Sequence, residues 1–191
     1  MALICGMLAM MGTAPALAQQ TFEDGTSTLS IGIGTAHDYY RGYDRYGGIA
    51  LKGMWDYGLG KIGPTTFSLG LEGGYARINY YHYWNSGFPR YRYAFNSFYL
   101  GIRPAIHYNF NVTHLDVYGG ISLGPRFVSY AYYYDGTGPE PPEYRSPVYD
   151  PAYFAGGVFL GVSYYMKPGL GVFAEFSSVF SNAAVGVSFR F

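Results

Sequence analysis

The sequence predicts an all-β fold, a transmembrane eight-stranded antiparallel up-and-down β-barrel. Charged residues make up only 13% of the 191 residues and aromatic residues 20%, whereas a water-soluble domain carries about 25% charge. From about Ser27 onward, apolar and small or polar residues alternate with the period of two that is typical of strands. After the first 18 residues, no apolar run is long enough for a spanning helix. Because hydrocarbon admits only helices and closed barrels, these observations favour a barrel.

The N-terminal segment, residues 1–18, is predicted to be a secretory signal peptide. Its apolar run ends in Ala16-Leu17-Ala18, a small-x-small cleavage site, so the mature chain should begin at Gln19 and reach the bacterial outer membrane through the periplasm. Residues 19–26 form a short N-terminal lead. The single cysteine, Cys5, falls in the signal. The mature chain is therefore expected to have no disulfide, thiolate metal site or cysteine nucleophile.

The barrel is predicted to occupy residues 27–191. Loops and turns alternate between long and short, as in outer-membrane barrels with short periplasmic turns and long outer loops. The predicted strands are 27–37, 47–57, 66–82, 93–110, 114–134, 151–166, 169–180 and 183–191. Extracellular loops are expected at about 38–46, 83–92, 135–150 and 181–182.

The last strand shows the alternation best. Val185, Val187 and Phe189 should face one side, with Ser188 and Arg190 on the other. The second set is small and polar, as a narrow lumen requires, so the apolar face should meet lipid. Aromatic residues gather on the apolar face near the predicted periplasmic strand ends and should form an interfacial girdle: Trp55, Tyr57, Phe67, Tyr108, Phe110, Tyr164 and Phe191.

Seven charged residues within the strands fall on the polar, lumen-facing side: Lys52, Glu72, Arg103, Asp116, Arg126, Glu175 and Arg190. Four of them, Lys52, Glu72, Arg103 and Glu175, lie five to seven residues from the predicted periplasmic strand ends. That is about 15 Å, half the bilayer core. The four should meet as a structural ion-pair plug. A gate or proton path and a catalytic carboxylate pair are the alternatives.

The chain resembles the small OmpA/OmpX-type outer-membrane barrels over its whole mature length, and the four mid-height charges resemble the interior charge quartet of the OmpA barrel. Its end is similar to the outer-membrane assembly signal, with Gly186, Phe189 and Phe191 matching and Ala184 standing where the family usually has a polar residue. The resemblance implies recognition of the C-terminal strand by the outer-membrane assembly machinery.

Tyrosines crowd the outer ends of the third, fourth and fifth predicted strands. These strands exceed the 9–11 residues that cross a membrane, so they should project as an aromatic sheet. Such a sheet is interpreted as a contact surface, with an enlarged girdle and loop packing as the alternative. The residues are Tyr80, Tyr81, Tyr83, Trp84, Tyr91, Tyr93, Tyr130, Tyr132, Tyr133 and Tyr134.

Two motifs of possible chemistry have simpler interpretations. Gly58–Gly63 matches GxGxxG, but Pro64 and a strand follow it instead of a helix, so a periplasmic turn is expected. His37 and His82 should lie at the outer mouth. Lipid A deacylases carry a His-x-Ser-Asn motif. Ser181-Asn182 is present here, but Val179 occupies the position of the histidine, which argues against this activity.

Inside the strands, Pro104 and Pro125 should each force a bulge, because proline removes a ladder hydrogen bond.

These observations predict a non-enzymatic outer-membrane barrel with a plugged polar lumen. Its Tyr-rich outer sheet should contact a partner: a protein, a glycan or a membrane-complex subunit. A narrow ion or small-solute channel is the second hypothesis, and a lipid-modifying enzyme is the third. Outer-membrane lipid should surround the wall. The net charge of zero gives no reason to expect nucleic acid, and neither a cofactor nor a metal is predicted.

Overall fold

The computed structural model describes residues 22–36, 44–82, 91–108, 110, 112, 114–134 and 152–191. Side chains are described throughout these ranges except at 44–47, 80–82, 91–93 and 130–134. The predicted signal peptide, and the predicted loops except for their margins and 181–182, lie outside the described residues.

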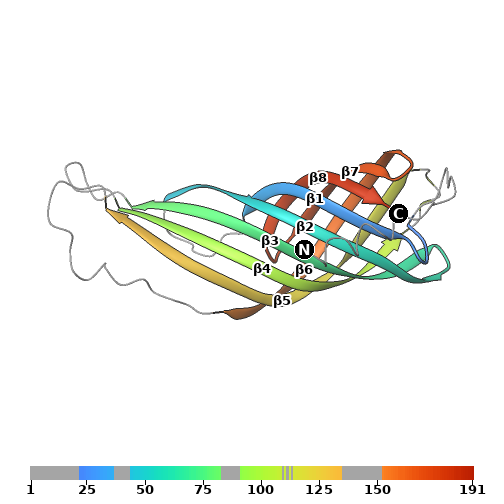
Figure 1. Ribbon diagram of the computed structural model, residues 1–191, viewed down its shortest axis with the longest axis horizontal. Coiled ribbons are helices and arrows are strands. Elements are labelled where there is room, and N and C mark those ends of the chain that lie inside the picture. The colour runs from blue at the N-terminus through green and yellow to red at the C-terminus, as the bar shows by residue number, and fades with distance from the viewer. Residues whose placement is uncertain are drawn as a thin grey trace, which may run out of the picture.

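Eight strands form a closed barrel in which each strand pairs antiparallel with its neighbours in the chain and β1 pairs with β8 (Figure 1). The predicted fold class is thereby confirmed. The strands are β1 (Ser27–Ala36), β2 (Asp44–Ile62), β3 (Thr65–His82), β4 (Tyr91–Tyr108), β5 (Leu115–Tyr134), β6 (Tyr153–Lys167), β7 (Leu170–Ser177) and β8 (Ser181–Arg190). Among the described residues, no helix is long and apolar enough to cross a membrane.

Side chains are distributed inside out relative to a water-soluble protein. On β1, Ile31 and Ile33 are 56% and 59% exposed, while Ser30 is buried and shares a 2.7 Å hydrogen bond with Ser188 of β8. The same alternation runs around the barrel, because successive side chains of a strand point to opposite faces. The apolar sets therefore form the outer wall, as predicted.

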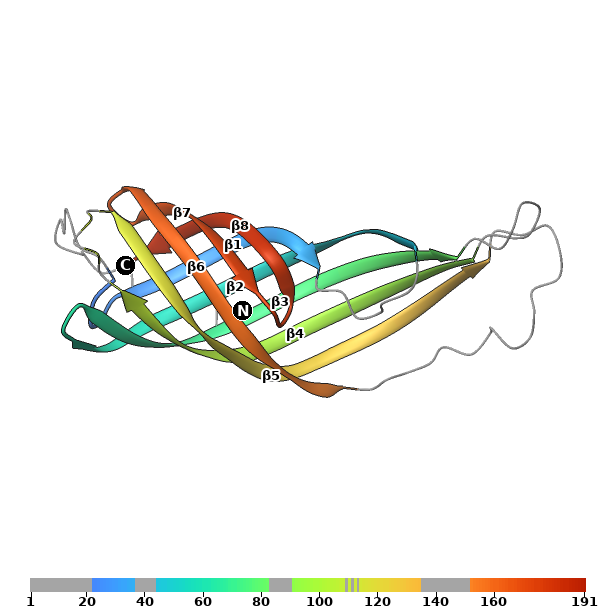
Figure 2. The same cartoon turned by 180° about the vertical axis from the view of Figure 1, so that it is seen from behind.

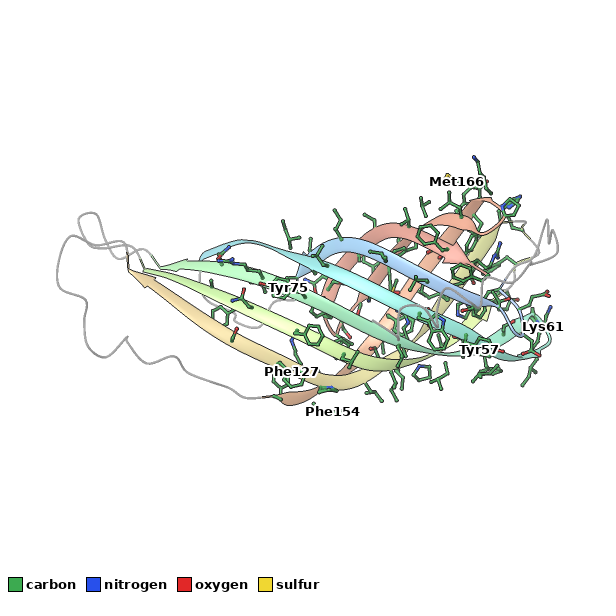
Figure 3. The ribbon with its side chains drawn as sticks, in the orientation of Figure 1. Tyr57, Lys61, Tyr75, Phe127, Phe154 and Met166 are labelled. Atoms are coloured by element: carbon green, nitrogen blue, oxygen red, sulfur yellow. The ribbon has the colours of Figure 1, made fainter. Side chains whose placement is uncertain are left out.

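Exposed aromatic residues mark both margins of the apolar wall. Near one end lie the seven predicted girdle residues, all at least 40% exposed. Farther along, Tyr75, Phe98 and Phe127 pair across β3, β4 and β5 as an upper aromatic row. The margins are about 20–25 Å apart along the barrel axis, the height of a lipid-facing band. Tyr57 and Lys61 at one end, and Tyr75 and Phe127 farther along, can be followed in Figure 3.

Beyond the upper aromatic row, the outward residues become polar. Arg77, Asn96 and Ser129 pair as the next outward row on the same three strands. The Tyr75 hydroxyl donates a 2.7 Å hydrogen bond to Oδ1 of Asn96, which links the two rows. This switch locates the boundary between the apolar wall and a water-facing surface.

The strands differ greatly in length. β2 to β5 contain 19, 18, 18 and 20 residues, whereas β1, β7 and β8 contain 10, 8 and 10. The long strands continue as a tapering sheet where the short ones have ended (Figures 1 and 2). We call the parts of β2–β5 past the upper aromatic row, residues 44–50, 76–82, 91–97 and 128–134, the projecting sheet.

Several predicted boundaries are wrong. The expected turn at Gly58–Gly63 is mostly strand: β2 runs to Ile62, and only Gly63 and Pro64 turn the chain, with Gly63 at φ 60°. The predicted loop 181–182 belongs to β8, and the bend lies at 178–180 instead. β2 and β4 begin at Asp44 and Tyr91, within the predicted loops 38–46 and 83–92. In each case, backbone pairing with a neighbouring strand extends the strand past its sequence signal.

The two strand prolines do not produce the predicted bulges. Across Pro104 and Pro125, β4 keeps one register with both β3 and β5, and β5 keeps one register with β6. A lost N–H removes one ladder bond, and the bonds on either side hold the strands in place. The described register shifts lie elsewhere, beside Thr35, Tyr46, Gly58 and Tyr165.

Candidate functional site

The lumen contains the buried polar residues that sequence reasoning selected. We call the end with the turns at 63–64 and 168–169 the turn end, and the end with the projecting sheet the loop end. The lumen is filled in three layers between them: a central charged cluster, an apolar layer toward the loop end and a histidine-containing layer at the turn end.

The central cluster brings the four predicted mid-height charges together. Lys52 Nζ lies 2.9 Å from Glu72 Oε1 and 2.5 Å from Glu175 Oε1. Arg103 closes the ring, with Nη1 3.5 Å from Glu72 Oε2 and Nη2 3.0 Å from Glu175 Oε2. All four side chains are 0% exposed. They come from β2, β3, β4 and β7, so the cluster ties distant strands across the lumen.

A fifth charge, Asp56, was missed by the sequence reasoning. Its Oδ1 lies 3.1 Å from Nε of Arg103, and the residue is 6% exposed. Asp56 shares the lumen-facing parity of Lys52, four residues earlier on β2, and that parity was the signal that could have found it. The cluster thus holds two positive and three negative formal charges.

Arg103 is the hub of the cluster. Its guanidinium contacts all three carboxylates and also lies 4.0 Å from the centre of the Phe159 ring. A planar guanidinium with five donors can serve several carboxylates at once, which an ammonium group cannot do with the same geometry. The contact with the aromatic ring adds a cation–π attraction to the ion pairs.

The loop-end layer is apolar and surrounds Arg126. Val179 and Phe180, from the bend between β7 and β8, are buried in the lumen beside Tyr99. Arg126 donates from Nε to Ser97 Oγ at 2.9 Å and from Nη1 to the Val179 carbonyl at 2.9 Å. The bend at 178–180 therefore folds inward because its two apolar side chains complete this layer.

The turn-end layer centres on His107, which sequence reasoning did not select. Its Nδ1 lies 3.0 Å from both carboxylate oxygens of Asp116, and its Nε2 lies 3.1 Å from Ser68 Oγ. The ring of Phe22, from the N-terminal lead, stacks on the imidazole with centroids 3.6 Å apart and planes 10° apart. All four residues are buried.

Of the remaining predicted residues, Arg190, Phe189 and Phe191 lie near the turn end, whereas Gly186 lies level with Lys52. Arg190 packs its guanidinium 3.8 Å from the centre of the buried Tyr165 ring. Gly186 is paired with Gly32 of β1, and Phe189 and Phe191 are exposed on the outer wall. Thus the seven predicted charges all lie on the lumen side, but only four belong to the central cluster.

The predicted aromatic surface lies outside the residues whose side chains are described. The backbone positions of Tyr80, Tyr81, Tyr91, Tyr93, Tyr130, Tyr132, Tyr133 and Tyr134 belong to the projecting sheet. Tyr83, Trp84 and His37 lie outside the described residues, as does the side chain of His82.

The chemistry available in the lumen is electrostatic and hydrogen-bonding. Among the described residues, no group of three His, Cys, Asp or Glu side chains could hold a metal ion. Each carboxylate of the central cluster faces a cation within ion-pair distance. Such an arrangement compensates buried charge and links strands across the barrel.

Comparison with known proteins places the chain by its fold. No protein-family model and no curated protein matches it. Among solved structures, OprG from Pseudomonas aeruginosa matches with a TM-score of 0.55 and 10% identity, over 91% of this chain and 99% of that chain. Neisserial surface protein A matches with a TM-score of 0.49 and 18% identity, over 87% and 96%.

A third match is Ail, the attachment invasion locus protein of Yersinia pestis, solved in complex with the heparin analogue sucrose octasulfate. Its TM-score is 0.45 at 15% identity, over 88% of this chain and 99% of that chain. The likeness to OprG shows the fold. This chain is an eight-stranded β-barrel of the outer-membrane type, as its resemblance to the OmpA/OmpX-type barrels implied.

Proposed function

We propose that this chain is a non-enzymatic outer-membrane barrel that presents its projecting sheet to a partner outside the cell, with a lumen closed by its own side chains. The observation that carries the proposal is the mismatch of strand lengths. Seven residues each of β3, β4 and β5 continue past the upper aromatic row. They form about 20 Å of sheet beyond the length that is needed to cross the membrane.

The projecting sheet has the features of a contact surface. β6 pairs with β5 only as far as Arg126 and Tyr153, so the described backbone of β5 from Phe127 to Tyr134 pairs on the β4 side alone. This edge contains no charged residue and no proline, the usual protections against strand addition. The sequence places four tyrosines on it. A partner could pair with this backbone and use the rings for specificity.

The geometry of the lumen favours a closed, side-chain-filled interior rather than an open pore. An eight-stranded barrel has an interior just wide enough for its side chains to fill. Here Arg103 and Arg126, the largest fully buried side chains, occupy two successive layers of it. The same geometry disfavours the alternative of a narrow channel. Single-channel recording in a planar bilayer separates the two, because a channel would conduct and its conductance would change with Arg103→Met.

The outer wall supports residence in the outer membrane. Its exposed Leu, Ile, Val and aromatic residues would meet acyl chains, and the turn end would face the periplasm. We further propose that Gly186, Phe189 and Phe191 at the C-terminal strand are recognised by the assembly machinery, and that cleavage before Gln19 releases the mature chain.

The test of the outer sheet is to shorten both of its hairpins. Deleting 79–94 and 131–152 should leave a folded barrel with unchanged heat resistance. A short Gly-containing turn joins Ile78 to Phe95, which are paired, and a longer Gly-containing linker joins Tyr130 to Tyr153, because Tyr153 pairs with Arg126, four residues or about 13 Å back along β5. The same deletions should abolish recovery of partners from solubilised outer membrane and from added host-surface glycans and proteins, detected by site-specific crosslinking and mass spectrometry.

The matched control cuts at the other end. Replacing Leu59–Ile62 of the β2–β3 hairpin by a shorter turn changes a similar hairpin outside the projecting sheet and should leave partner recovery intact. If the shortened barrel still captures the same partners at the same yield, the projecting sheet is not the working surface. An unchanged lipid A mass spectrum with and without the protein is expected, and an altered one would favour the enzyme alternative.

A further inference from the structure

The turn end of the lumen contains a docked segment, residues 22–26 of the N-terminal lead. Phe22 is 2% exposed, which is unusual for a residue outside every strand. Its ring covers His107, and its carbonyl oxygen accepts a 3.0 Å hydrogen bond from Thr66 Oγ1, which is also buried. The lead is therefore held both by its side chain and by its backbone.

The outer half of the lead docks on the extension of β2. Gly25 N donates to the Gly58 carbonyl at 3.0 Å, and Gly58 N donates to the Thr26 carbonyl at 2.9 Å. Glu23 pairs with Lys61, with Oε1 and Nζ 3.1 Å apart. Gly58 and Lys61 belong to the GxGxxG match, so this motif serves as a docking strand.

Gly58 is needed for the close approach of the lead. A Cβ at this position would lie 2.2 Å from the Glu23 carbonyl oxygen and 3.3 Å from the Phe22 ring. Two residues farther along the same strand, a Cβ at Gly60 would meet nothing within 4 Å. The absence of a side chain at 58 therefore makes room for the lead, whereas position 60 has no such constraint.

We propose that the turn end carries a binding site for an extended segment with an aromatic residue followed by an acidic one, and that the chain's own lead fills this site and seals the lumen from the periplasm. The ring is recognised by the imidazole of His107, the carbonyl by Thr66 and the carboxylate by Lys61. The inference rests on the proposed membrane orientation and adds a second closure to the central cluster, which lies deeper in the barrel.

The two closures are built separately. Phe22, Glu23 and Thr26 make their contacts with His107, Thr66, Gly58 and Lys61, none of which belongs to the central cluster. Unseating the lead should therefore admit solvent to His107 without breaking the ion pairs of Arg103. Conversely, loss of the central cluster should leave the lead in place.

The seal can be measured by the reaction of histidines with diethylpyrocarbonate in the mature protein, folded in lipid vesicles permeable to the reagent. Peptide mass spectrometry should find His107 protected and His114 modified, because His114 lies in the turn before β5 and is partly exposed. In Phe22→Gly and in Gly58→Val, modification of His107 should accelerate by roughly an order of magnitude, as for a locally opened segment. Gly60→Val is the matched control and should behave as the wild type.

The ligand class is tested on Phe22→Gly, in which the aromatic site is empty. The dipeptide acetyl-Phe-Glu-amide should slow the modification of His107 again, and acetyl-Ala-Glu-amide should not. Equal reaction of His107 and His114 in the wild type would refute the seal. Equal rates in Gly58→Val and Gly60→Val would refute docking on Gly58, and protection by neither dipeptide would refute the binding site.

A separate readout distinguishes failure of this inference from failure of the proposed plug. Ionic conductance of the wild-type barrel with normal protection of His107 would refute the central plug and leave the turn-end site standing. Rapid modification of His107 in a barrel that does not conduct would refute the turn-end seal and leave the central plug standing. Resistance of the folded band to heating in detergent shows that each variant is folded.

Discussion

The wall between the two aromatic margins and the projecting sheet share strands β2 to β5 but differ in which residues face outward. In the wall, outward residues are apolar and inward ones polar, as with Ile102 and Arg103 on β4. Past the upper aromatic row, the outward positions carry Arg77, Asn96 and Ser129 instead. The strand geometry is unchanged, so the change in residue type reports a change of solvent from lipid to water.

The wall and the projecting sheet also differ in buried charge. The central cluster lies inside the wall, where all eight strands close around it, and the described part of the projecting sheet has no equivalent. Buried charges are costly unless they are paired, and a closed lumen holds the partners in place. We therefore expect substitutions to have very different effects in the two regions.

The largest effect is expected at Arg103. Arg103→Met would leave three carboxylates facing Lys52 alone, and should cost about 3–5 kcal/mol of unfolding free energy because uncompensated charge stays buried. Glu72→Leu should cost less, because the remaining charges of the cluster balance. Urea titration of the barrel in vesicles, followed by tryptophan fluorescence, measures both.

A double variant sharpens this expectation. Arg103→Met with Glu72→Leu removes one charge of each sign and should be more stable than Arg103→Met alone. If the double variant is the less stable of the two, the side-chain packing of the cluster outweighs its charge balance.

An intermediate effect is expected from one substitution made in both regions. Ile102→Arg places a cation on the lipid face of β4 near mid-height and should cost about 2–4 kcal/mol, whereas Asn96→Arg, in the polar row beyond the upper aromatic row, should cost about 0–1 kcal/mol. The same unfolding titration gives both values. Equal costs would show that the upper aromatic row does not mark the membrane boundary.

The smallest effect is expected at the link between the two rows. Asn96→Ala removes the hydrogen bond from the Tyr75 hydroxyl and should cost about 0.5–1.5 kcal/mol. Tyr75→Phe removes the same bond from the other side, and the two losses should not add. Additive losses in the double variant would mean that the bond contributes nothing in the membrane.

The sequence predicted the features that depend on local alternation. A period of two assigns each residue to a face wherever the strand is continuous, and for this reason Lys52, Glu72, Arg103 and Glu175 could all be assigned to the lumen. The same reasoning extends to Asp56, which was overlooked although its parity was visible. It failed at strand ends such as Ile62 and at the bend of 178–180, where the partner strand or the lumen decides the path of the chain.

The sequence by itself determined the barrel class, the apolar outer wall and the polar lumen, because these follow from the pattern of neighbouring residues along each strand. Only the tertiary structure decided which side chains meet. Closure of the barrel brings Arg103 to Asp56, folds Val179 and Phe180 inward, and places Phe22 on His107. These contacts join residues far apart in the chain, and they depend on the stagger and width of the closed barrel, which no single strand encodes.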